Sequence, residues 1–422
     1  MLARYLCLAL SVIAMPAVEA QTDSPLPPAR LETLIPPPLD FVDIAISPDG
    51  RHLAVAKGSN AGMVALLDGH AGTAYTRFSV PSLAISADGT HLAYEAFKGD
   101  IRVLVVDGRE TNSYDHFRLT SFVFSPDGNH QAYTAHRDDA KTQMIVIDGK
   151  RSPEYDDIQA GTPVFSPDGT RLAYPVRHGA KWQVIVDEKA GPECSGIGGD
   201  SLIFSPDSKR VAYAAQIGAK WSVALDRKQV GGGYDGIANL VFSPDGKRVA
   251  YAAQADAKWA IMLDGKELAG GYDESVAPVF SPDGRRIAYS ARTGRSTFVV
   301  VDGKKVGPEY QDAGVPVFSP DGKRVAYAAA MNRKWFVVTE LPPDGEYDEI
   351  ARGSLVFSRD SRHLAYVAKT GPKFTVIIDG WPDQQSDHIV LGNAKLTFDK
   401  EGRFAYLAVK GDTVFRVWHD KF

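Results

Sequence analysis

The sequence predicts an all-β repeat protein, and three observations support this prediction. A unit of about 39 residues recurs along the chain, each copy reads as four short strands joined by turns, and the two ends of the chain complement each other. A fixed period of this length is typical of solenoids, propellers and arrays. Helical periodicity is absent from the units, which disfavours a helical solenoid.

The repeat is anchored by the pattern F-S-P-D-G or a close variant of it. The serine of this pattern recurs every 38 to 41 residues, and a degenerate tenth copy begins at Leu396. The nine serines, or their equivalents, are Ser47, Ser86, Ser125, Ser166, Ser205, Ser243, Ser281, Ser319 and Ser358.

Each unit is expected to contribute four strands. The first is the apolar segment that ends in the S-P-D-G turn, where proline presets φ, aspartate bonds local amides and glycine accepts positive φ. The second, R-V-A-Y-A-A, alternates apolar with small or polar residues. The third is typified by K-W-A-I-M-L-D and ends in a D-G-K turn, and the segment ending in Y-D-x-I is assigned as the fourth. Four strands in about 40 residues form one propeller blade.

The chain ends predict a closed ring. Leu39–Ile44 (LDFVDI) matches the Y-D-x-I segment, and Thr413–Phe422 matches a third strand, so the last unit lacks a fourth strand. We expect Leu39–Ile44 to supply it and to remove an open sheet edge. Residues 39–422 are therefore predicted to form a β-propeller of about ten four-stranded blades, a single ring closed by the N-terminal strand. Two five-bladed propellers are the alternative, because propellers typically have four to eight blades.

The N-terminal residues are predicted to direct export. Residues 1–20 combine Arg4, a short apolar run and Val18-Glu19-Ala20 before a new N-terminus at Gln21, which is typical of a signal peptide. Residues 21–38 are expected to be a Pro-rich linker. The mature protein is then periplasmic or extracellular, without membrane insertion. It keeps a single cysteine, Cys194, so it has no intrachain disulfide.

Composition narrows the classes of partner. The chain has 422 residues, of which 44% are hydrophobic and 23% charged, as in ordinary globular proteins. Its net charge of −5 offers no basic excess for phosphate, so nucleic acid is not an expected partner.

Copies of F-S-P-D-G-K-R-V-A-Y in an exported chain resemble the WD-repeat-like propeller units of the TolB family, which also occur in the propellers of prolyl-oligopeptidase-type enzymes. The resemblance covers nearly all of residues 39–422. It implies a periplasmic setting and protein–protein contacts. Two differences from the TolB family limit what can be transferred to this chain. An N-terminal α/β domain of the TolB kind is missing from the sequence, and the repeats outnumber those of TolB.

The sequence contains no recognisable catalytic constellation. There is no G-x-S-x-G, and the ten histidines form neither H-x-H nor H-E-x-x-H pairs. The repeated turn aspartates are interpreted as local backbone acceptors, since ten copies of one turn need ten copies of one residue. We therefore expect a protein that is not an enzyme and that needs no metal or cofactor.

A binding surface is predicted on one face of the blades. The first-to-second and third-to-fourth turns share one face, here called the turn face, which is repetitive. The second-to-third hairpins and the blade-to-blade loops share the opposite face, the loop face, which varies and is where binding usually occurs. The candidates are residues that close second strands and carboxylates of Y-D segments: His136, Arg177, Gln216, Gln254, Arg292 and Lys369, with Asp156, Asp235 and Asp273. The competing interpretation is a solvated polar rim.

The leading functional hypothesis is a non-enzymatic binding or scaffold protein of the cell envelope, with a protein partner. A glycan-binding module is an alternative. The competing class is a propeller enzyme of lactonase or lyase type with a shallow site at the axis, which would need acids, bases or a metal where the repeats otherwise agree.

Overall fold

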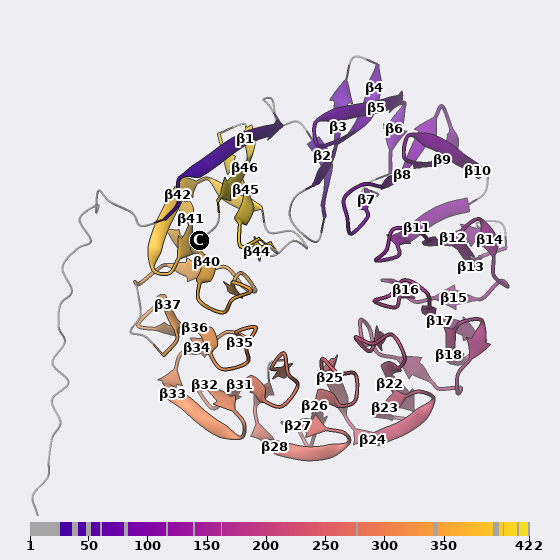
Figure 1. The fold of residues 1–422 in the computed structure, drawn as a ribbon. Coiled ribbons are helices and arrows are strands. Elements are labelled where there is room, and N and C mark those ends of the chain that lie inside the picture. The colour runs from indigo at the N-terminus through magenta and orange to yellow at the C-terminus, as the bar shows by residue number, and fades with distance from the viewer. Residues whose placement is uncertain are drawn as a thin grey trace, which may run out of the picture.

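The computed structural model describes residues 26–35, 41–47, 52–59, 61–79, 83–114, 117–137, 140–161, 163–275, 277–340, 345–390, 396–399, 401–411 and 413–420. In these ranges the regular structure consists of strands, which form ten antiparallel sheets arranged as one ring (Figure 1). This confirms the predicted β-propeller of about ten blades. No helix in the described ranges has the length and apolar character needed to span a bilayer. The predicted signal peptide lies outside the described residues.

Within each blade the strands follow one another from the centre of the ring to its rim, with the first strand innermost (Figure 1). The second strands, rich in A-Y-A, are β3 (Leu53–Ser59), β8 (Leu92–Lys98), β12 (Gln131–Arg137), β17 (Leu172–His178), β22 (Val211–Ile217), β26 (Val249–Ala255), β31 (Ile287–Thr293), β36 (Val325–Met331), β40 (Leu364–Thr370) and β45 (Phe404–Lys410). The third strands are β4 (Gly62–Leu67), β9 (Ile101–Val106), β13 (Thr142–Ile147), β18 (Lys181–Val186), β23 (Lys220–Leu225), β27 (Lys258–Leu263), β32 (Ser296–Val301), β37 (Lys334–Val338), β41 (Lys373–Ile378) and β46 (Thr413–His419).

The outer strands follow the D-G turns. They are β5 (His70–Tyr75), β10 (Arg109–Tyr114), β14 (Lys150–Arg151), β19 (Lys189–Ala190), β24 (Lys228–Tyr234), β28 (Lys266–Tyr272), β33 (Lys304–Tyr310) and β42 (Trp381–Ser386), in blades 1 to 7 and 9. Blade 8 has no fourth strand among the residues described.

The innermost strand is continuous in three blades and split in seven. The continuous ones are β2 (Phe41–Ile46), β11 (Phe117–Phe124) and β25 (Gly236–Phe242). The split ones are β6 (Arg77–Phe78) with β7 (Ala84–Ile85), β15 (Asp157–Ile158) with β16 (Val164–Phe165), β20 (Gly196–Ile197) with β21 (Ile203–Phe204), β29 (Glu274–Ser275) with β30 (Val279–Phe280), β34 (Asp312–Ala313) with β35 (Val317–Phe318), β38 (Glu349–Ile350) with β39 (Val356–Phe357), and β43 (His388–Val390) with β44 (Thr397–Phe398).

The split strand corrects one expectation. The Y-D-x-I segment is divided between two blades: in blades 5, 6 and 7 its tyrosine, or the equivalent one, ends the fourth strand, at Tyr234, Tyr272 and Tyr310. In blade 4, for example, Asp157 and Ile158 pair with Arg177 and Val176 on the second strand, ahead of the Val164–Phe165 piece. The residues after the tyrosine therefore open the innermost strand of the next blade. The sequence does not reveal this division, because the two-residue strand pieces are too short to show a period.

Every junction between neighbouring blades has its own apolar core. Ten clusters of buried side chains occupy the ten junctions, including the one between blade 10 and blade 1, which is built around Leu34, Leu53 and Leu407. The core is therefore continuous around the ring, so the alternative of two five-bladed propellers is wrong. Buried second-strand tyrosines such as Tyr133, Tyr251 and Tyr289 contribute to these junction cores.

An N-terminal strand closes the ring, as predicted, but the segment is a different one. The strand is β1 (Ala29–Ile35), which pairs antiparallel with β46 as the outer strand of blade 10. Leu39–Ile44 was expected here; instead Phe41–Ile46 pairs with β3 as the innermost strand of blade 1. Part of the predicted Pro-rich linker is thus a blade strand. Leu39–Ile44 resembles the Y-D-x-I segment, which was assigned to the fourth strand. Because that segment instead leads into the innermost strand of the next blade, Leu39–Ile44 was assigned to the wrong blade.

A buried polar cluster locks this closure. The His419 ring is 1% exposed; its Nδ1 lies 2.7 Å from the Pro27 carbonyl oxygen and its Nε2 lies 2.7 Å from the Asp383 carboxylate. The Tyr406 hydroxyl donates to the same carboxylate at 2.7 Å. The cluster therefore joins β42, β45 and β46 to the segment that precedes β1. We call these four residues the closure cluster.

Candidate binding site on the loop face

The turn face is built from one repeated hydrogen-bond pattern. The Ser166 hydroxyl donates to Asp168 at 2.6 Å and accepts from the Arg171 amide at 3.0 Å. Hydrogen bonds from the Ser166 hydroxyl, and then from the Thr170 amide and hydroxyl, lower the pKa of Asp168 to about 2. The equivalent serines are 0 to 3% exposed. This confirms that the turn aspartates are structural acceptors.

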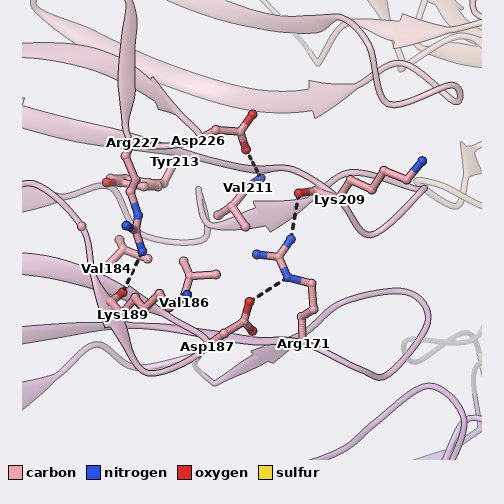
Figure 2. A pocket seen from close by; sticks show the side chains of 11 residues that line it. Arg171, Val184, Val186, Asp187, Lys189, Lys209, Val211, Tyr213, Asp226 and Arg227 are labelled. Carbon is pink, nitrogen blue, oxygen red and sulfur yellow. Dashed lines mark hydrogen bonds and ion pairs between the residues drawn. The ribbon is translucent and has the colours of Figure 1, made fainter.

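Arginines on the turn face connect neighbouring blades. Arg171 donates through Nε to Asp187 at 2.8 Å and through Nη1 to the Lys209 carbonyl in the next blade at 2.8 Å (Figure 2). The same Nη1 also donates to the Ser208 carbonyl at 2.9 Å. The other arginines that make such contacts are Arg210, Arg286 and Arg324. In blades 1, 2, 3 and 9 a histidine takes this position and contacts the aspartate of the D-G turn that follows the third strand. These histidines are His52, His91, His130 and His363.

The cavity in Figure 2 belongs to the same repeated architecture. It has a volume of about 340 Å³ and lies between blades 4 and 5, against Val184, Val186, Val211 and Tyr213. Cavities with equivalent linings occur between blades 1 and 2 and between blades 3 and 4. Because the repeat itself generates these cavities, they do not distinguish one blade junction from another, and we do not assign a binding site to them.

The three carboxylate candidates lie on the loop face, and Asp235 and Asp273 connect neighbouring blades. Asp235 accepts from the Lys220 ammonium at 2.5 Å, and from the Asp256 amide in the next hairpin at 3.2 Å. Asp273 is held in the same way by Lys258 and by the Gly294 amide, and Asp156 accepts from the Gly179 amide at 2.6 Å. Hydrogen bonds from their lysines lower the pKa of Asp235 and of Asp273.

The six candidates that close second strands lie on the same face, in blades 3, 4, 5, 6, 7 and 9. Three cations face an acid one strand inward: Arg177 lies 3.6 Å from Asp157, Arg292 lies 3.2 Å from Glu274, and Lys369 lies 4.0 Å from Glu349. Gln216 and Gln254 instead pair with Gly196 and Gly236, and His136 pairs with Arg118 in the backbone register. The structure thus places all nine candidates on one face but distributes them around the ring.

A cavity of about 610 Å³ on this face distinguishes blades 7 to 9 from the other blades. We call it the blade-8 cavity. It is lined by charged side chains, by Trp335 and by small or apolar residues, among them Glu274, Arg292, Thr297, Asp312, Pro316, Ala351 and Arg352. Sequence reasoning found Arg292 but missed Asp312 and Arg352. The available signal was Ala330, the only small residue among those that close the second strands.

In the part of the chain that the structure describes, no group of three or more His, Cys, Asp or Glu side chains is placed to hold a metal ion. Trp182, Trp259 and Trp335 pack against the cores of the blade junctions.

Comparisons with known proteins add little beyond the architecture. No protein-family model and no curated protein sequence matches the chain. Similar solved structures include a eukaryotic initiation factor, with 12% identity over 78% of this chain and 94% of that one, at a TM-score of 0.46. The Dos1 propeller has 12% identity over 94% and 95%, at 0.40. TolB from Acinetobacter baumannii has 14% identity over 69% and 77%, at 0.29. With scores this low, it is the ten-bladed ring itself that supports the propeller fold.

Proposed function

We propose that the protein is a non-enzymatic scaffold of the cell envelope that binds a protein partner through its loop face. The observation that carries this proposal is the contrast between the two faces. On the turn face, charged groups such as Arg171 and Asp168 are engaged in contacts repeated from blade to blade. On the loop face, the residues that close the second strands differ between blades, and residues of blades 7 to 9 surround the blade-8 cavity. Variable side chains on a rigid scaffold are typical of a binding surface.

Capture of a partner tests this function. We expect the wild-type protein to crosslink to a defined partner in envelope extract, and the triple variant Arg177→Ala, Arg292→Ala and Lys369→Ala to lose it. Each of these ion pairs is partly exposed and contributes only about 0–1 kcal/mol, so thermal stability should change little.

A matched control removes the same charge from the opposite face. The variant Lys209→Ala, Lys247→Ala and Lys323→Ala deletes three exposed cations of the turn face and should capture the partner as the wild type does. Equal capture by all three proteins, or by none, would overturn the proposal. A large loss of melting temperature in the loop-face variant would show that its three cations are structural.

Export is part of this proposal and has its own test. The apolar run before Val18-Glu19-Ala20 supports cleavage after Ala20. Mass spectrometry of the protein recovered from the source cells should find a mature chain that begins at Gln21, in the periplasmic or extracellular fraction. A chain that keeps Met1 and stays in the cytoplasm would contradict the envelope setting.

A further inference from the structure

The blade-8 cavity lies where the repeat departs from its own pattern, and the departure indicates what the cavity binds. We infer that it is a binding site for an arginine side chain of a polypeptide partner. The inference rests on the proposed function, because it names the chemical group that the loop face recognises.

Blade 4 shows how the repeat itself holds an arginine at this position. Arg177 lies between two cross-strand neighbours, Asp157 on the inner side and Trp182 on the outer side. Its Nε is 3.6 Å from the Asp157 carboxylate, and its guanidinium carbon is 5.9 Å from the centre of the Trp182 ring. A carboxylate and an aromatic ring are the two groups that a planar guanidinium pairs with best.

Blade 8 keeps both of these partners but lacks the cation. Asp312 pairs with Ala330, and Ala330 pairs with Trp335, in the same register as in blade 4. Side chains of directly paired residues point to the same side of a sheet. Asp312 and Trp335 both line the cavity. Among the described residues Asp312 has no cationic partner, and one of its oxygens accepts a hydrogen bond from the Ala313 amide at 2.8 Å. The acid and the ring thus flank a position where the chain's own side chain ends at Cβ.

A second small residue enlarges the same space. Thr297 is the second residue of the third strand of blade 7, the position that Trp182, Trp221, Trp259 and Trp335 hold in other blades, and it lines the cavity. Arg292 also lines the cavity, but it does not replace the missing cation, because it is paired with Glu274 at 3.2 Å. The small side chains of Ala330 and Thr297 leave room for a long cationic side chain of a partner. The Asp312 carboxylate and the Trp335 ring are both present to bind it.

Arg352 is the residue of the cavity whose removal should strengthen binding of a cation. It lines the cavity and is exposed, and no ion pair between it and Asp312 occurs in the described part of the chain. Its charge repels an incoming cation and would attract an anion. Arg352→Ala should therefore strengthen binding of a cationic ligand.

The test uses the full-length mature protein, N-acetyl-arginine amide as the probe, and the indole N–H signals of its tryptophans in NMR spectra. We expect saturable movement of the Trp335 signal, which Trp335→Phe identifies. Asp312→Asn, which is nearly isosteric, should weaken binding at least about tenfold, because it removes the charge-assisted hydrogen bonds. N-acetyl-citrulline amide, which lacks the charge, should not bind.

A filling variant and its matched control complete the design. Ala330→Arg should pair with Asp312 as Arg177 pairs with Asp157, and so abolish probe binding while the ring stays folded. Gln216→Arg adds the same charge at the same register of blade 5, opposite Gly196, and should leave binding unchanged. Three results would overturn the inference: no saturable binding, binding that Asp312→Asn and Ala330→Arg leave intact, or weaker binding by Arg352→Ala.

The two proposals fail separately. Probe binding at Trp335 without any captured protein would keep the arginine site and overturn the scaffold function. A partner captured equally by wild type and Asp312→Asn, with no probe binding, would keep the scaffold and overturn the arginine site.

Discussion

Asp383→Asn should destabilise the folded protein by about 3–5 kcal/mol, the cost of leaving a buried charge without its partner. Both nitrogens of the His419 ring face acceptors, the Pro27 carbonyl and the Asp383 carboxylate, so the protonated ring can donate a hydrogen bond to each. Below its folded pKa, which lies above 6.5, the ring is an imidazolium, and Asp383, with a side chain 7% exposed, is its counter-charge. Asparagine keeps the shape of the aspartate and removes only that charge.

The same cluster predicts a pH dependence of stability. Burial alone lowers the pKa of His419, but the hydrogen bond and charge of Asp383 and the Pro27 carbonyl outweigh it and raise the pKa above 6.5. Burial alone raises the pKa of Asp383, but hydrogen bonds from His419 and Tyr406 and the His419 charge lower it below 3.8. A raised histidine pKa stabilises the fold below 6.5, and this is lost as pH rises through the folded value. A lowered aspartate pKa stabilises the fold above 3.8, and this is lost as pH falls.

Urea unfolding at a series of pH values measures both effects. The wild type should lose stability above pH 6.5, and His419→Gln should lack this dependence. His363→Gln is the matched control, because His363 also contacts an aspartate, Asp379 at 2.6 Å, but that pair is partly exposed and should contribute only about 0–1 kcal/mol. A loss below about 1 kcal/mol in Asp383→Asn would show that the closure cluster does not hold a charged pair.

Leu34→Ala should open the ring, at a cost of about 2–5 kcal/mol. Leu34 is 6% exposed and packs with Leu53 and Leu407 in the core between blade 10 and blade 1. When β1 detaches, the edge of β46 loses its partner strand. A bare edge pairs readily with other chains, so sedimentation velocity should show association that increases with concentration.

The control lies three residues earlier on the same strand. Leu31 is 53% exposed, so Leu31→Ala should change stability by no more than about 0.5 kcal/mol and leave the protein monomeric to the same degree as the wild type. Equal effects of the two substitutions would contradict β1 as the strand that closes the ring.

The loop-face candidates show which properties of a site the order of the residues can predict. Arg177, Arg292 and Lys369 were placed on the correct face because hairpins on one side of a blade follow from strand order. Their partners were not found, although the sequence contains them: Asp157, Glu274 and Glu349 each precede their cation by 18 to 20 residues. A register between strands is needed before such a spacing can be recognised as a contact.

The blade, its repeat and the structural role of the turn residues can be predicted from the sequence alone. These properties are local: the S-P-D-G turn, the alternating second strand and the D-G hairpin each need only neighbouring residues, and ten copies reinforce the signal. Tertiary structure decided the rest. Whether Ala29–Ile35 or Leu39–Ile44 closes the ring depends on which edge is left open about 380 residues away. Likewise, Asp312, Ala330 and Trp335 come together beside the blade-8 cavity only because pairing brings their three strands into one line.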